Sequence, residues 1–176
     1  MVRLFSIFIS VFTILSATII NVPGDYSTIQ EGINASVDGD TVLVAQGNYI
    51  ENLVLEKEIV LTSHAIYDDL GSDWTSNDHV TNTRIMGGSP TNSKKGSCIQ
   101  VSYGNIQPTI MGFTVSNGVG TSMIVDDCGV SRTERSGGAI MAFQAYPILS
   151  HNRFMNNGVS MFDEDNAVQA IQNGGA

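Results

Sequence analysis

The sequence predicts an all-β fold, a right-handed parallel β-helix with an N-terminal amphipathic capping helix, and three observations support this. Short β-prone runs alternate with corners, and three of the 18 glycines follow an asparagine, a pair that tolerates positive φ in tight corners. Two stretches of the chain resemble each other at a regular spacing. A single segment near the N-terminus has helical periodicity. These features are typical of a solenoid whose first coil is covered by a helix.

The expected strands are short and separated by turn-forming residues. Strands of this kind can form either a sandwich or a solenoid, and internal similarity is what decides between the two. The β-prone runs are residues 41–45, 53–55, 59–62, 98–103, 110–115 and 139–143.

The internal repeat relates residues 96–118 to residues 137–158, with a spacing of 39 to 41 residues. That spacing is too long for one coil, but residues 119–136 form a polar, charged insert of 18 residues. Without the insert each copy has about 21 to 23 residues, which suits a coil of three strands and three corners. Stacked coils would pair every strand with those above and below it. The matched positions are Pro108 with Pro147, Ile110 with Leu149, Val115 with Phe154, Asn117 with Asn156, and Ile99 with Ile140.

The capping helix is expected from about Ser27 to Ser36. Tyr26, Ile29 and Ile33 fall on one face of it, and Asp25 or Ser27 could cap its start. Because the end of a solenoid exposes unpaired backbone groups, a helix over the first coil would protect them.

The first 18 residues are expected to be a secretory signal peptide. Arg3 precedes an apolar run from Leu4 to Leu15, and small residues follow it. The run is too short to span a bilayer comfortably, although an uncleaved N-terminal anchor is an alternative. We expect the mature chain to begin somewhere from Ala17 to Asn21, with no membrane span after cleavage.

The expected organisation is a signal peptide at 1–18, a cap at 19–38 and coils at 39–176, with a polar loop at 64–83. The last four residues, Asn173-Gly-Gly-Ala176, repeat Ser136-Gly-Gly-Ala139. A further coil is therefore expected to begin here, which predicts a solenoid truncated at its C-terminus.

The charge balance argues against nucleic acid as a partner. The chain has 17 Asp and Glu against 8 Lys and Arg, and its net charge is −9. Only Lys94 and Lys95 form an adjacent basic pair, which cannot neutralise a row of phosphates. An acidic surface suits solubility or cation binding outside the cell.

Three features are candidates for binding or cross-linking. Trp74 and Tyr67 lie in the polar loop and could stack on a sugar ring, although Trp74 could equally pin the loop onto the solenoid. Cys98 and Cys128 could form one disulfide in an exported protein, or both could be free thiols. The three histidines are far apart in sequence and share no metal-ligand spacing.

The N-terminal part resembles the cap and first coils of the pectin-lyase-like β-helix superfamily. The residues that carry the resemblance are Val22-Pro-Gly-Asp-Tyr-Ser-Thr-Ile-Gln-Glu-Gly-Ile33, then Gly39-Asp-Thr-Val-Leu-Val-Ala-Gln-Gly-Asn-Tyr-Ile-Glu51, then Ile59-Val-Leu-Thr-Ser63. The likeness extends over about residues 22 to 176 and is greatest to large bacterial secreted or surface β-helix proteins. Because the matched residues are architectural, the resemblance is specific for the fold and weak for the function.

The resemblance implies two classes of function. The first is a secreted or cell-surface protein without catalytic activity, structural, adhesive or binding a polysaccharide or cell-surface glycan. The second is a polysaccharide lyase or carbohydrate esterase whose active site lies on coils beyond these residues. Lyases of the superfamily hold Ca²⁺ with clustered carboxylates, and catalytic residues cannot be assigned here. The carboxylates that could hold Ca²⁺ are Asp126, Asp127, Asp163 and Asp165.

Overall fold

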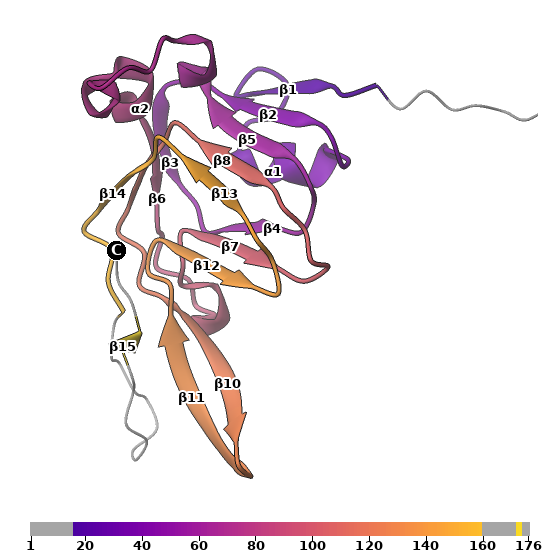
Figure 1. The fold of residues 1–176 in the computed structure, drawn as a ribbon, viewed down its shortest axis with the longest axis vertical. Helices are drawn as coiled ribbons and strands as arrows, with labels where there is room; N and C mark the ends of the chain where they lie inside the picture. Colours follow the sequence, from indigo (N-terminus) through magenta and orange to yellow (C-terminus); the bar gives the residue numbers. More distant parts are fainter. Residues whose placement is uncertain (1–15, 160–171, 174–176) are drawn as a thin grey trace, which may run out of the picture.

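The computed structural model describes residues 16–159 and 172–173 of the chain, and these residues form mostly parallel β-sheets with two short α-helices (Figure 1). The helices are α1 (Ile29–Ala35) and α2 (Asp78–Asn82), with 3-10 turns η1 (His64–Tyr67), η2 (Trp74–Ser76) and η3 (Ser93–Lys95). The strands are β1 (Ile19–Val22), β2 (Thr41–Val44), β3 (Gly47–Ile50), β4 (Leu53–Leu55), β5 (Val60–Ser63), β6 (Thr83–Met86), β7 (Ile99–Ser102), β8 (Thr109–Met111), β9 (Thr114–Ser116), β10 (Thr121–Asp127), β11 (Val130–Ser136), β12 (Ile140–Phe143), β13 (Ile148–Ser150), β14 (Arg153–Met155) and β15 (Gln172–Asn173).

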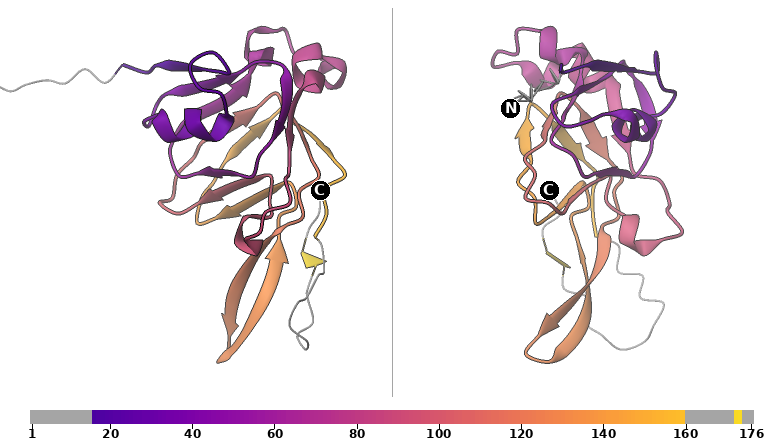
Figure 2. Two further views of the ribbon diagram at one scale, coloured as in Figure 1. Left: turned by 180° about the vertical axis from the view of Figure 1, so that it is seen from behind. Right: turned by 90° about the vertical axis from the view of Figure 1, so that its right-hand side faces the viewer.

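Three parallel sheets take up most of the strands. Their strand orders are β1-β2-β5-β8-β13, β3-β6-β9-β14 and β4-β7-β12. From β2 onward the chain passes through these sheets in the same order, and it begins a new circuit at β5, at β8 and at β13. Consecutive strands therefore lie in different sheets, and each strand pairs with its counterpart from the circuit before (Figure 1, Figure 2).

The register of the last two circuits is the one that the internal repeat predicts. Ile110 pairs with Leu149, Val115 with Phe154, and Ile99 with Ile140. The polar insert between the two copies forms an antiparallel hairpin of β10 and β11, in which Thr121 lies opposite Ser136. β15 pairs in parallel with β11, and Asn173 lies opposite Ser136 as in the sequence alignment.

Some strands differ from the predicted runs. The run 110–115 is divided into β8 and β9 at Gly112, which has a φ of +80°. A Cβ at this position would lie only 2.5 Å from Ser63 Oγ, so no larger residue fits there. β3 and β6 were not predicted, because their sequences, Gly47-Asn-Tyr-Ile50 and Thr83-Arg-Ile-Met86, lack the alternation of polar and apolar residues that indicates a strand.

The core consists of apolar ladders that run from circuit to circuit. Val42, Leu61 and Ile110 occupy paired positions in one sheet and are each fully buried. The sequence leaves open which side of β2 faces inward, and the structure places Val42 and Val44 in the core cluster. In the last described circuit the same positions are partly exposed, with Leu149 at 45% and Phe154 at 37%. Among the described residues, the last circuit thus presents apolar side chains at its surface.

α1 is the predicted helix, but its boundaries and cap differ from the expectation. It begins one residue after Thr28, which accepts a hydrogen bond from Glu31 N while the Glu31 side chain accepts one from Thr28 N. This capping box replaces the predicted cap by Asp25 or Ser27. Ile29 and Ile33 are buried, as expected for the inward face.

Two charged side chains fasten α1 to the first circuit. Glu51 accepts hydrogen bonds from Ile29 N at 3.0 Å and Gln30 N at 2.9 Å, at the helix end where the macrodipole favours a carboxylate. Lys57 Nζ donates to the carbonyl oxygens of Ile33, Asn34 and Ser36 at the other end. The structure thus gives these two charged residues a role in docking the helix.

Residues 1–15 of the expected signal peptide lie outside the described residues. β1 pairs with β2 from Ile19 to Val22, and Ile20 and Val22 are buried. Removal of the chain before Ile19 would therefore leave β1 whole, whereas removal up to Asn21 would not. Within the described part of the chain, no helix is both long and apolar enough to cross a membrane.

Candidate functional site

The polar loop at 64–83 is a folded unit built from η1, η2 and α2, at the top of Figure 1. Asn77 caps α2, because its Oδ1 accepts a hydrogen bond from Val80 N at 3.1 Å. Val80 is fully buried, and its carbonyl oxygen accepts a hydrogen bond from Thr114 Oγ1 of β9 at 2.8 Å. These contacts hold the loop against the second sheet.

Two of the three histidines meet within this loop. The rings of His64 and His79 lie with centroids 5.8 Å apart, and His79 Nδ1 is 2.7 Å from Asp68 Oδ2. Asn77 Nδ2 donates to the same carboxyl oxygen at 2.8 Å. These two hydrogen bonds, that of His79 first, lower the pKa of Asp68 below its ordinary value.

The third histidine reaches the loop from another circuit. The rings of Trp74 and His151 are edge-on, with centroids 5.3 Å apart. His151 follows β13 in a left-handed conformation with φ of 51°, and Ser150 Oγ lies 2.6 Å from its Nδ1. Trp74 is half-buried, so it pins the loop onto a later circuit, one of the two roles that the sequence allows.

Tyr67 is an exposed aromatic residue of the same loop. Its side chain is 66% exposed, and its ring packs edge-on against His64 at 6.1 Å between centroids. We name the group His64, Tyr67, Asp68, Trp74, His79 and His151 the loop cluster. It comprises two sets of contacts at one loop, His64 with Tyr67, Asp68 and His79, and Trp74 with His151. It combines two aromatic rings with imidazole and carboxylate groups, which suits apolar contact and hydrogen bonding to a polyhydroxylated ligand. Sequence distance hid this convergence, since His151 lies 77 residues beyond Trp74.

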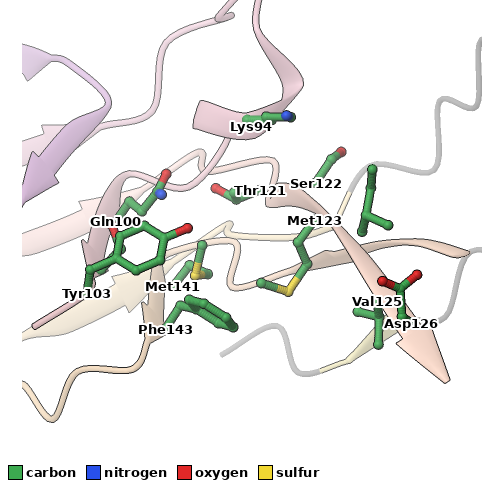
Figure 3. A pocket seen from close by; sticks show the side chains of 12 residues that line it. Lys94, Gln100, Tyr103, Thr121, Ser122, Met123, Val125, Asp126, Met141 and Phe143 are labelled. Carbon is green, nitrogen blue, oxygen red and sulfur yellow. The ribbon is translucent and has the colours of Figure 1, made fainter. Parts of the chain in front are cut away.

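A second feature is a groove of about 460 Å³ between the hairpin and the sheet of β4, β7 and β12 (Figure 3). Tyr103 and Phe143 line it from adjacent circuits, with ring centroids 5.7 Å apart and planes at 79°. Tyr103 has φ of 66°, a left-handed conformation that is uncommon for a bulky residue. The remaining lining residues are Lys94, Gln100, Ser102, Thr121, Ser122, Met123, Ile124, Val125, Asp126 and Met141.

Of the residues proposed for Ca²⁺, Asp126 is the one whose side chain the structure describes. It lies near the tip of the hairpin and accepts a hydrogen bond from Ser131 Oγ across it, and Asp127 follows it in β10. Asp163 and Asp165 lie outside the described residues. In ranges 16–159 and 172–173, no group of three or more His, Cys, Asp or Glu side chains could hold a metal ion.

Both cysteines are free thiols, one of the two alternatives that the sequence leaves open. Cys98 is buried at the base of the hairpin, and its Sγ lies 3.1 Å from the Ser116 carbonyl oxygen. Cys128 is exposed at the hairpin tip, beyond a strand of seven residues that spans about 20 Å. A disulfide needs Cα atoms within about 7 Å, so these positions do not fit one. Desolvation raises the pKa of Cys98 to about 11.

No protein-family model and no curated protein sequence matches this chain.

Proposed function

We propose that this chain is a right-handed parallel β-helix of the pectin-lyase-like type, exported to the cell surface or the medium, where it binds glycans without catalysing a reaction. The repeated passage through three parallel sheets supports the solenoid. Right-handed crossovers are the rule for parallel strands, which supports the handedness. The order of charged, apolar and small residues in positions 1–18 supports export.

The loop cluster is the observation that carries the glycan-binding proposal. The only tryptophan, an exposed tyrosine and all three histidines gather at one loop that is fastened to two circuits. Aromatic rings present an apolar face with a polar edge, and neighbouring imidazole and carboxylate groups can bond to hydroxyls. A preformed cluster of this kind can bind a sugar without a large ordering cost.

The contacts of the histidines fit a binding surface. Ser150 and His151 are neighbours in sequence, and no carboxylate is hydrogen-bonded to the imidazole of His151 in the described part of the chain. The carboxylate of Asp68 is hydrogen-bonded to His79 and Asn77, and both contacts stabilise the loop. A nucleophile with its base and orienting group would need another arrangement.

Glycan binding can be tested with variants of Tyr67. We expect the chain to bind one class of glycan on an array, and Tyr67→Ala to weaken that binding about fivefold, since a stacking contact contributes on the order of 1 kcal/mol. Tyr146→Ala is the matched control, because Tyr146 is 63% exposed and lies outside the loop cluster. The two affinities are measured by titration calorimetry with the glycan that the array identifies.

Three results would refute the proposal. Release of unsaturated or de-esterified products from pectin or alginate, with or without Ca²⁺, would identify an enzyme. Equal loss of affinity in Tyr67→Ala and Tyr146→Ala, or no binding to any glycan, would remove the loop cluster as the site.

A further inference from the structure

The hairpin has one edge with which no described strand pairs, although η3 and Ser97 lie against its first residues. In its sheet the strand order is β10-β11-β15, so β11 is flanked on both sides and β10 on one. The backbone groups on the outer side of β10 make no backbone hydrogen bond with another described segment. An extended strand with such an edge is a template for pairing with another chain.

The groove follows this open edge. Six consecutive residues of β10, 121 to 126, line it. Side chains of a strand point alternately to opposite faces, so a cavity that meets six in succession lies along the strand edge and not against one face. An extended segment beside β10 would lie in this groove, which Met141 and Phe143 line from the side of the sheets (Figure 3).

The charges along the groove favour a second copy of this chain as the occupant. The exposed Lys94 lies at the end nearest the sheets, and the exposed Asp126 lies near the hairpin tip. Two copies arranged antiparallel would bring Asp126 of each close to Lys94 of the other. Such self-complementarity is what a closed twofold interface requires.

The residues of β10 are also compatible with this arrangement. With Ile124 at the twofold axis, Met123 lies opposite Val125 of the second copy, and Ser122 lies opposite Asp126. Apolar residues thus face each other, and each carboxylate faces a hydroxyl donor without a second carboxylate opposite it. Ile124 is 68% exposed, which fits a residue that is covered in a dimer.

The position of the hairpin leaves space for the second copy. The hairpin projects away from the three sheets in each view (Figure 1, Figure 2). An antiparallel pair of hairpins would therefore place the two bodies at opposite ends. We propose that β10 pairs antiparallel with β10 of a second copy, so that the two hairpins form one continuous sheet.

The oligomeric state, measured by sedimentation velocity over a range of concentrations, tests this proposal. The chain is expected to be a dimer that Ile124→Asp weakens at least tenfold. Val130→Asp is the matched control, since Val130 is 66% exposed on β11, away from the open edge. Circular dichroism of each variant checks that the monomer keeps its fold.

A charge swap tests the predicted orientation. Lys94→Glu and Asp126→Lys alone are each expected to weaken the dimer, and the two changes together are expected to restore it. A monomer at all concentrations, or a dimer that no hairpin variant affects, would overturn the proposal. Binding of extended peptides by a monomeric chain would show that β10 accepts another partner.

Discussion

At the scale of single residues, successive circuits approach each other so closely at some glycines that a side chain would not fit. A Cβ at Gly118 would lie 1.7 Å from the carbonyl oxygen of Gly138, and a Cβ at Gly138 would lie 2.5 Å from that of Gly158. Asn157 bridges the same corner, because its Oδ1 accepts from Gly118 N and its Nδ2 donates to Val115 O. At this corner Asn117 makes the turn with a φ of 63°, and Gly118 allows the close approach of the backbone.

Gly118→Ala is predicted to destabilise the fold by about 3 kcal/mol, since backbone must move to admit the methyl group. Gly71→Ala is the control, because a Cβ there meets nothing within 4 Å. Denaturant unfolding followed by circular dichroism measures both. Equal stability of the two variants would mean that the circuits are farther apart at this corner.

At the scale of elements, α1 depends on contacts that its own sequence does not provide. A helix of seven residues is too short to be stable alone, so docking must hold it. Gln30 extends the docking, because its side-chain amide both donates to and accepts from the backbone of Val54. Together with Glu51 and Lys57, it ties the cap to the strands of the first circuit.

Lys57→Met is therefore predicted to lower the free energy of unfolding by about 1.5 kcal/mol, because three carbonyl groups lose a charged donor. The control is Lys95→Met, an exposed lysine, for which the change should stay within about 0.5 kcal/mol. Thermal unfolding of the two variants gives the comparison. An equal effect of both changes would show that Lys57 does not fasten the helix.

The loop at 64–83 should loosen in acid. The pKa of Asp68 is lowered in the folded state, so its stabilising effect is complete above the ordinary value of 3.8 and is lost as the pH falls through the lowered pKa. The fluorescence of Trp74, the only tryptophan, should report this transition. Asp68→Asn should abolish the fluorescence transition, and Asp69→Asn should leave it unchanged. If the transition persists in Asp68→Asn, another titrating group causes it.

At the scale of the whole molecule, the sequence predicted strand pairing better than it predicted the site. Ile99, Ile110 and Val115 have apolar counterparts in the next circuit, so the repeat fixes the register once the insert is removed. β3 and β6 carry a weaker pattern and were missed. The loop cluster could not be predicted, because the contact of Trp74 with His151 depends on which circuits the loop covers.

Cross-linking of neighbouring circuits measures whether the circuits stack as a solenoid. Asn48 and Arg84 are exposed and directly paired in parallel strands, whereas Met86 pairs with Ile50. In a Cys128→Ser background, Asn48→Cys with Arg84→Cys should form a disulfide, since paired Cα atoms lie about 4.8 Å apart. Asn48→Cys with Met86→Cys should not, because a shift of two residues separates the Cα atoms by about 8 Å. Oxidation of the second pair in preference to the first would contradict the stacked register.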